Sequence, residues 1–330
     1  MKWLLPLTLL PLTAFASSKI TVSGISSGAY MAQQFHTAFS SDVSGVGIVA
    51  GGPYYCAGGQ AMLAMNRCMN TKMGSPIPEQ SVYAAKILAM SGLIDPVSNV
   101  ANSRVYVFSG RNDQTVFPMV ADAAVETYRL WGVNPRNIRY ENKMNAGHTF
   151  PTVGFGNNCE ASEVPFISKC GKDVAGEILN HVIGPLHRKT APRSNRFFTI
   201  NQLAGMYSAE VAIANMGRKA YAYVPDGCEY PDANGCHVHV AFHGCKQTLD
   251  DIKTTFIKEA GYNAWAESNR IVVVYPQAVK SPMTNPNGCW DWWGYAGQFY
   301  HTQQGVQLKQ VYKMIKNIKE GRLKLEPVGI

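Results

Sequence analysis

The chain has 330 residues, of which 46% are hydrophobic and 16% are charged, so it can bury a full-sized core in one large domain or two small ones. Its formal net charge is +8, but the Lys and Arg residues are scattered, whereas a nucleic-acid interface would cluster them. Composition therefore argues against nucleic acid as a partner and favours a mildly cationic, solvated surface.

The first 16 residues have the pattern of a secretory signal peptide. Met1-Lys2-Trp3 supplies a positive start, the stretch 4–15 is apolar, and Ala14-Phe15-Ala16 is a small-x-small cleavage signal. The apolar run is too short to span a bilayer, and no later stretch is long and apolar enough to do so. We therefore expect a secreted chain, extracellular or periplasmic, that begins near Ser17 and has no integral membrane segment.

The first strand of this mature chain leads into a turn typical of a catalytic nucleophile. A β-branched run reaches Gly24-Ile25-Ser26-Ser27-Gly28, which fits G-x-S-x-G, and residues 29–39 favour a helix. Between a strand and a helix, the two glycines permit a sharp bend that exposes the Ser26 hydroxyl at its tip, rather than that of Ser27. The alternative is an ordinary strand-to-helix turn, because Gly and Ser are common in turns.

Strands and helices alternate through the rest of the chain. Apolar runs predict strands over residues 43–50, 104–109, 137–141, 219–224, 238–242 and 271–275. Helical periodicity predicts helices over residues 79–90, 118–130, 173–183, 251–268 and 304–319. The stretch 184–194, which has two prolines and several basic residues, favours a linker, and 276–300 is a long aromatic loop. This alternation predicts an α/β fold.

The eight cysteines indicate disulfides. Their number is even, no C-x-x-C motif is present, and an exported chain folds in an oxidising compartment. Three pairs are close in sequence, which leaves one longer closure. Spacing does not fix the connectivity; it favours the pairs Cys56–Cys68, Cys159–Cys170, Cys228–Cys236 and Cys245–Cys289.

An acid and a histidine follow the serine in the chain order of an α/β-hydrolase triad, each on a loop after a strand. Asp113 follows one predicted strand and His148 follows the next. Ser26 would attack a carbonyl, His148 would transfer the proton, and Asp113 would hold the tautomer of the imidazole. The alternatives are that Asp113 only caps a helix, that His148 has no role, or that Asp95 or Asp122 is the acid.

The turn at His243-Gly244, in the second half of the chain, does not follow the order in which an α/β-hydrolase usually carries its motifs. In an ordinary α/β-hydrolase the oxyanion loop precedes the nucleophile strand, but here the nucleophile turn comes directly after the signal peptide. The segment HVAFHGC, residues 239–245, is a predicted strand that runs into this turn. Circular permutation accounts for the order, with helix 304–319 in the place of the helix before the nucleophile strand. The oxyanion donors would then be the backbone N–H groups of Ser27 and Cys245.

The sequence therefore predicts a circularly permuted α/β-hydrolase with a mostly parallel, doubly wound sheet. We expect residues 17–330 to form a single catalytic domain. Within it, residues 17–183 would carry the triad, and residues 195–330 would carry the oxyanion segment and the aromatic substrate loop.

The aromatic loop after Cys289 has two interpretations. Aromatic side chains bury large areas in cores, but in a loop rich in Gly, Asn and Pro some are expected to stay exposed. Exposed apolar surface suits a water-insoluble partner. The aromatic residues of the loop, of which the first is the leading candidate, are Trp290, Trp292, Trp293, Tyr295, Phe299 and Tyr300.

Two histidines on one predicted strand raise the question of a metal site. His237 and His239 alternate, so their side chains share a face that a metal ion could occupy. No third ligand lies within reach in the sequence. We therefore expect no metal and no cofactor.

Seven segments, spread over nearly the whole mature chain, resemble the secreted, single-domain, circularly permuted poly(3-hydroxybutyrate) depolymerases: SGISSGAYMA, AGGPYYCA, GRNDQTVFP, GHTFPT, HVAFHGCKQ, IVVVYPQA and NPNGCWDWWGY. The resemblance implies the same triad, Ser26, Asp113 and His148, and the same oxyanion donors as above. It also implies that Trp290 lines the polymer-binding crevice.

We therefore expect a secreted serine esterase that hydrolyses the ester bonds of poly(3-hydroxybutyrate) and its oligomers through an acyl-enzyme intermediate. One alternative is a secreted carboxylesterase that acts on feruloyl, acetyl or small soluble esters. The other, from a different class, is a catalytically inactive protein that binds polymer surfaces. Against this last alternative, all three triad positions and the oxyanion turn hold competent residues. The oligomeric state stays open.

Overall fold

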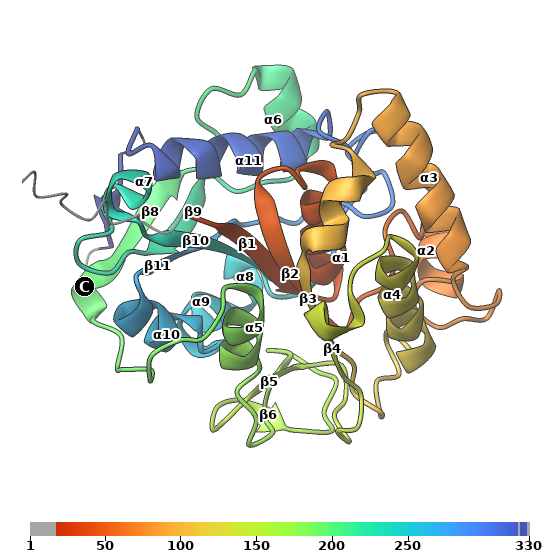
Figure 1. The fold of residues 1–330 in the computed structure, drawn as a ribbon, viewed down its shortest axis with the longest axis horizontal. Helices are drawn as coiled ribbons and strands as arrows, with labels where there is room; N and C mark the ends of the chain where they lie inside the picture. Colours follow the sequence, from red (N-terminus) through yellow and green to blue (C-terminus); the bar gives the residue numbers. More distant parts are fainter. Residues whose placement is uncertain (1–17, 323, 329–330) are drawn as a thin grey trace, which may run out of the picture.

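The computed structural model describes residues 18–322 and 324–328 of the protein. The signal peptide expected over residues 1–16 lies outside the described residues. A twisted sheet of nine strands runs through the centre of the molecule, with helices on both of its faces (Figure 1). Within the described ranges, no helix has both the length and the apolarity that crossing a membrane requires.

The central sheet is mostly parallel. Its order is β12-β8-β9-β11-β10-β1-β2-β3-β4, and the five neighbouring pairs from β11 to β4 are parallel, whereas β9 is antiparallel to both of its neighbours and β12 is antiparallel to β8. The strands in chain order are β1 (Ile20–Ile25), β2 (Val43–Val49), β3 (Arg104–Phe108), β4 (Ile138–Glu141), β8 (Phe197–Asn201), β9 (Lys219–Tyr223), β10 (His237–Phe242), β11 (Ile271–Tyr275) and β12 (Glu326–Pro327). The α/β expectation with a mostly parallel sheet is confirmed.

The first described strand lies at the middle of this sheet. β1 pairs in parallel with β10 on one side and with β2 on the other, so that Val22 lies between Val240 and Val46. Because side chains alternate along a strand, Val22 packs in the core on one face, whereas Ile25 packs in the core on the other. The two halves of the chain therefore build one sheet.

Helices cover the two faces of the sheet unequally. The larger core lies under α1, α3, α4 and α11, and the smaller core lies under α5, α9 and α10 (Figure 1). The helices are α1 (Ser27–Ala38), α2 (Ala61–Asn66), α3 (Pro78–Met90), α4 (Pro118–Leu130), α5 (Val174–Val182), α6 (Ser208–Ala214), α7 (Pro231–Asn234), α8 (Leu249–Ile252), α9 (Thr255–Glu259), α10 (Tyr262–Asn269) and α11 (Val306–Lys319). Three short 3-10 helices connect them: Val97–Asn102, Pro135–Asn137 and Ser194–Arg196.

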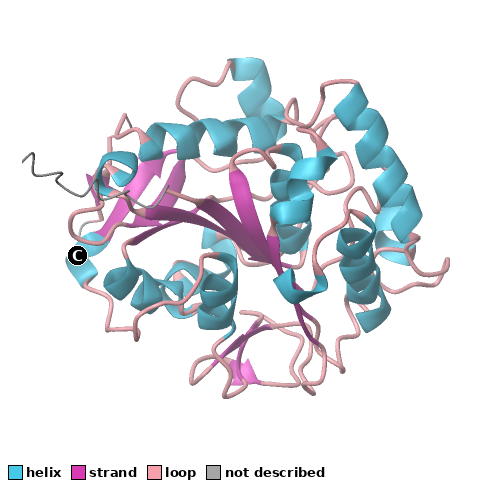
Figure 2. Ribbon diagram, in the orientation of Figure 1, coloured by secondary structure: helices cyan, strands magenta, loops and turns pink. Residues whose placement is uncertain are grey.

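Some elements differ from the sequence expectation. The helix expected over 251–268 is three short helices, because Lys253 and Gly261 adopt positive φ angles of 53° and 98° that interrupt it. Helices α2 and α6, strand β8 and a small three-stranded sheet were not predicted. That small sheet, near the bottom of Figure 2, consists of β5 (Phe150–Thr152), β6 (Asn157–Asn158) and β7 (Ile167–Lys169).

All eight cysteines form disulfides in the pairs that spacing favoured. Three bridges close short loops with sequence separations of 12, 11 and 8 residues. The fourth, Cys245–Cys289, joins residues 44 apart and connects the turn after β10 to the start of the aromatic loop. Closing the longer loop removes more conformational freedom from the unfolded chain.

Several buried histidines are held neutral. His36 lies on α1 with both ring nitrogens hydrogen-bonded, to Tyr128 and to Ser103. Burial lowers the pKa of His36 to about 3. His239 is likewise bonded, to Thr21 and Ser23, so its ring is occupied within the fold.

These histidines predict acid lability. Between pH 6.5 and about 3, the unfolded chain binds a proton at His36 that the folded chain does not, so stability falls as the pH falls. In His36→Gln, the slope of the unfolding free energy against pH should be smaller by about 1.4 kcal/mol per pH unit between pH 4 and 6, measured by denaturant titration. His187→Gln, the same replacement at an exposed position, is the control. An unchanged slope in His36→Gln would contradict the prediction.

Candidate active site

Ser26 occupies a strained turn between β1 and α1. Its φ of 57° and ψ of −123° are rare for a residue with a side chain. The flanking glycines are required by close approach: a Cβ on Gly24 would lie 2.2 Å from the Gly28 carbonyl oxygen, and a Cβ on Gly28 would lie 2.3 Å from that of His243. The Ser26 N–H donates to the Val49 carbonyl at 2.9 Å, which fixes the turn to the neighbouring strand. The close packing of the glycines and this hydrogen bond therefore hold Ser26 in its strained conformation at the carboxyl edge of the sheet.

His148 and Asp113 form a buried pair. The His148 Nδ1 lies 2.8 Å from Asp113 Oδ2, and the two residues are 4% and 2% exposed. The other carboxylate oxygen, Oδ1, accepts the backbone N–H groups of Thr115 and Val116, both at 2.8 Å. Because a carboxylate only accepts, the Nδ1–H of the imidazole donates to it, and Nε2 is left as the proton acceptor.

A loop of the small sheet positions the imidazole from the other side. The His148 backbone N–H donates to Ser162 Oγ at 2.7 Å. The Phe166 ring lies edge-on to the imidazole, with 6.0 Å between ring centroids. The Cys159–Cys170 bridge ties the ends of this loop together. His148 is thus held by both its side chain and its backbone.

The turn after β10 lies beside Ser26. A Cβ on Gly244 would be 3.2 Å from the Ser26 Cβ. His243 Nε2 accepts the Ala278 N–H at 3.1 Å, so its Nδ1 carries the proton and donates to the Gly244 carbonyl at 2.7 Å. Burial lowers the pKa of His243 to about 4, which keeps the ring neutral. The Gly244–Cys245 peptide is therefore fixed.

Two backbone donors next to Ser26 are left free by these bonds. Within the described residues, neither the Ser27 amide nor the Cys245 amide has a hydrogen-bond partner. In a trans peptide the N–H points away from the C=O, so the bond from His243 to the Gly244 carbonyl turns the Cys245 N–H away from His243. Unpaired amides of this kind are available to an anionic oxygen.

Ser26, His148 and Cys245 open onto one cleft of about 510 Å³. Its other walls are mainly apolar or uncharged side chains. They are Ala61, Ala64, Met65, Met69, Thr115, Ser162, Phe166, Lys246, Asn285, Pro286, Asn287, Cys289, Trp292 and Trp293. Asp113 lies behind His148 and does not line the cleft. The structure therefore brings Ser26 and His148 to a common space, with Asp113 in support.

The aromatic loop is placed differently from the sequence expectation. Trp290 is 0% exposed and packs against Phe242 and His243 in the core, so it does not line the cleft. The backbone N–H of Trp290 donates to Ser27 Oγ at 3.3 Å, which places Trp290 next to the turn that carries Ser26. Trp292 and Trp293 line the cleft in its place. This is a correction to the predicted contact of Trp290 with substrate.

Asp291 anchors the loop that carries these two tryptophans. Its carboxylate accepts the backbone N–H groups of residues 293–296 at 2.7–3.2 Å. Burial raises the pKa of Asp291 to about 6, although these four donors favour the charged form. Trp292 is further fixed by stacking on Tyr30 of α1, with 4.1 Å between ring centroids. The loop wall of the cleft is therefore rigidly attached to the nucleophile helix.

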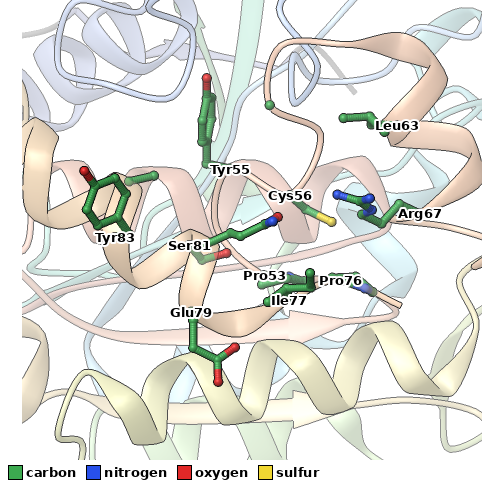
Figure 3. A pocket seen from close by; sticks show the side chains of 13 residues that line it. Pro53, Tyr55, Cys56, Leu63, Arg67, Pro76, Ile77, Glu79, Ser81 and Tyr83 are labelled. Atoms are coloured by element: carbon green, nitrogen blue, oxygen red, sulfur yellow. The ribbon is translucent and has the colours of Figure 1, made fainter. Parts of the chain in front are cut away.

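A second cavity, of about 440 Å³, is lined by residues from α2, α3 and the segment around Cys56 (Figure 3). Leu63 and Arg67 at α2 face it, and Glu79, Ser81 and Tyr83 come from α3. None of the three residues predicted as the triad lines this cavity. Ser26 and His148 open onto the first cleft instead.

The sequence analysis did not single out the residues that orient the site. Phe166 and Asp291 lie in segments without a periodic pattern, and Gln247 was only part of the segment HVAFHGCKQ. The two histidines considered as metal ligands are in hydrogen bonds instead: His237 Nδ1 accepts the Lys19 N–H, and His239 bonds Thr21 and Ser23.

No family model matches the chain. The poly(3-hydroxybutyrate) depolymerase of Delftia acidovorans is 38% identical over 316 residues, which cover 94% of this chain and 62% of the relative. The chain thus spans less than two thirds of that relative. The polyhydroxybutyrate depolymerase of Talaromyces funiculosus is 34% identical over 330 residues, which cover 95% of this chain and 93% of the relative.

Two solved structures are similar as well. One is the crystal structure of a PHB depolymerase from Penicillium funiculosum, and the other is a serine-to-alanine variant of a PHB depolymerase complexed with an R3HB trimer. Each has a TM-score of 0.82 and 33% identity, and each match covers 92% of this chain and 96% of the other. Matched nearly end to end in sequence and in structure, the chain belongs to the polyhydroxybutyrate depolymerase family of ester hydrolases.

Proposed function

We propose that the protein is a secreted serine esterase that hydrolyses poly(3-hydroxybutyrate) and its oligomers. The observation that carries the proposal is that a strained serine, a His–Asp pair and a turn with a free amide meet at one cleft. The substrate class is inferred from the relatives, which are named for this polymer, and from the R3HB trimer bound to one of them. Four disulfides support an oxidising, extracellular or periplasmic location.

The proposed reaction has two steps. Ser26 Oγ attacks the ester carbonyl while His148 Nε2 takes its proton, and His148 then returns the proton to the leaving alkoxide. A water activated by the same nitrogen hydrolyses the acyl-enzyme. Asp113 keeps the imidazole in the required tautomer and stabilises its protonated form. An ester needs no metal for this chemistry, because protonation by His148 lets the leaving group depart as a neutral alcohol.

The negative oxygen that forms during attack needs donors. The amides of Ser27 and Cys245 are assigned this role because they lie beside Ser26 and neither has a hydrogen-bond partner among residues 18–322 and 324–328. The removal of one such donor costs about 2.7–4 kcal/mol of transition-state stabilisation. One donor comes from α1 and the other from the turn after β10, so the two halves of the chain would each supply one.

The proposal includes a circularly permuted α/β-hydrolase. Without β12, the order is β8-β9-β11-β10-β1-β2-β3-β4, in which β9 alone runs antiparallel, as the second strand of the α/β-hydrolase sheet does. Numbered from β8, the serine, acid and histidine loops follow the fifth, seventh and eighth strands of this order. Lys319 at the end of α11 donates to the Ser18 carbonyl at 3.3 Å, so α11 ends beside the start of β1. This continuity favours one mature catalytic domain over residues 17–330.

Recognition of an insoluble polyester is assigned to the apolar rim of the cleft. Trp292 and Trp293 form one wall, and Met65 of α2 forms another. Met65 is 54% exposed. Exposed apolar surface next to a reactive cleft suits a chain of aliphatic esters.

The proposal is tested by incubating the protein with a polyhydroxybutyrate suspension, beside a panel of soluble esters and a serine-directed covalent inhibitor. We expect clearing of the suspension, release of soluble acids and loss of both activities with the inhibitor. Turnover of feruloyl or acetyl esters without clearing would favour the alternative carboxylesterase. Binding to polymer with no turnover of any ester would favour an inactive binding protein.

Ser26→Ala should abolish turnover and leave the fold intact. The variant loses the nucleophile, so kcat on a soluble ester should fall by at least about 10⁴-fold. The melting temperature should stay near that of the wild type, because alanine keeps the Cβ and the backbone conformation of the turn. A variant with wild-type rate would remove Ser26 from the proposed reaction.

Trp293→Ala should reduce polymer hydrolysis more than hydrolysis of a short soluble ester. Its ring lines the cleft, where a long substrate extends beyond the scissile bond. Trp290→Ala is the matched control: its ring is in the core, so it should lower stability by about 3–5 kcal/mol and should not discriminate between the two substrates. Equal losses of both activities in Trp293→Ala would indicate a structural role only.

Removal of the Cys245–Cys289 bridge should lower kcat. The double replacement with serine keeps the backbone amides but releases the turn that holds one of them, and a loss of about tenfold is expected. The control is the double replacement of Cys228 and Cys236 with serine. The disulfide between them closes a loop away from the cleft, so its loss should lower stability but not kcat. If the two double variants had the same kcat relative to wild type, the Cys245–Cys289 bridge would have no specific effect on catalysis.

A further inference from the structure

Gln247 lies next to the turn after β10, and no step above uses it. It is 2% exposed. Its Oε1 accepts the Gly244 N–H at 2.6 Å, and its Nε2 donates to the Pro165 carbonyl at 2.7 Å and to the Phe166 carbonyl at 3.4 Å. Only this orientation of the amide satisfies both ends, because an N–H must donate and a carbonyl must accept. Gln247 therefore bridges two loops from different halves of the chain.

One end of this bridge is the turn that carries the proposed oxyanion donor. Gly244 lies between Gln247 and the serine: a Cβ at this position would be 3.1 Å from Gln247 Oε1 and 3.2 Å from Ser26 Cβ. On the far side of Cys245, the Lys246 N–H donates to the Asn287 carbonyl at 2.7 Å. With the bond from His243 to the Gly244 carbonyl, three backbone groups on either side of the Cys245 amide are hydrogen-bonded: the Gly244 N–H, the Gly244 carbonyl and the Lys246 N–H. Gln247 provides one of these bonds.

The other end of the bridge is the loop that holds the imidazole. Phe166, whose carbonyl faces Gln247, places its ring against His148. Ser162, four residues earlier, accepts the His148 N–H at 2.7 Å. The backbone of Phe166 has a φ of 53°, so this conformation depends on its surroundings to persist. A contact from Gln247 to this segment therefore bears on the position of His148.

We propose that Gln247 is a positioning residue that sets the oxyanion turn at a fixed distance from the histidine loop. It contacts neither substrate nor a reacting atom, and its effect passes through Gly244 on one side and Phe166 on the other. The inference rests on the proposed function, in which the base and the oxyanion donors must act together on one carbonyl. In such sites a displacement of about 1 Å costs about 10²-fold in rate.

The test is Gln247→Met, which keeps the length of the side chain and removes all its hydrogen bonds. With a soluble ester, we expect kcat to fall by about 10- to 100-fold while KM changes by less than about twofold, because the loss is confined to the transition state. An aryl boronic acid, which adds to the serine oxygen and presents an oxyanion to the turn, should bind more weakly by a similar factor.

Gln310→Met is the matched control. Gln310 is also buried, and its Nε2 donates to two backbone carbonyls of one loop, those of Gln202 and Ala204, away from the cleft. It should lose a comparable amount of melting temperature but keep kcat and boronate affinity. Wild-type kcat in Gln247→Met, or equal losses of kcat in the two variants, would overturn the inference. A wild-type protein that cleaves no ester would instead overturn the proposed function, and this inference with it.

Discussion

The parallel pairing of β1 with β10 is the contact on which the site depends. It brings the backbone of α1 so close to the end of β10 that Gly28 leaves no space for a Cβ beside the carbonyls of Phe242 and His243. From this approach follow the position of Ser26, the turn at Gly244 and the burial of Trp290 beneath both. A side chain at position 28 would separate the serine from that turn, whatever else the fold preserved.

The sequence predicted those elements that are determined by the residue pattern of a short segment. Strand β11 and helix α4 are found over the residues expected, because an unbroken β-branched run and a strong 3.6-residue period leave little choice. The glycine spacing around Ser26 identified the strained turn, and the short cysteine spacings identified three bridges. The pairing of His148 with Asp113 was also expected, because each follows a strand of one parallel sheet and such loops meet at one edge.

What the sequence could not predict depends on contacts between distant segments. Trp290, Trp292 and Trp293 are chemically alike and close in sequence, and only the contacts of Trp290 with Phe242 and His243 show that it packs in the core while the other two line the cleft. The helix ends at Lys253, although no glycine or proline at or next to this position indicates a break in the sequence. Gln247 has partners 82 and 81 residues away, and nothing in its neighbours indicates them. The residues that orient the site can therefore be identified only from the three-dimensional structure.

The central strand pair also sets a condition on when the cleft can exist. Thr21 and His239, which bond across it, are 218 residues apart, so the partner of the first strand is synthesised long after that strand itself. Until then Ser26 has no turn at Gly244 beside it, and the bridge at Cys245 has no oxidant on the inner side of the membrane if the chain is exported. The cleft can therefore assemble only once β10 has been synthesised and paired with β1.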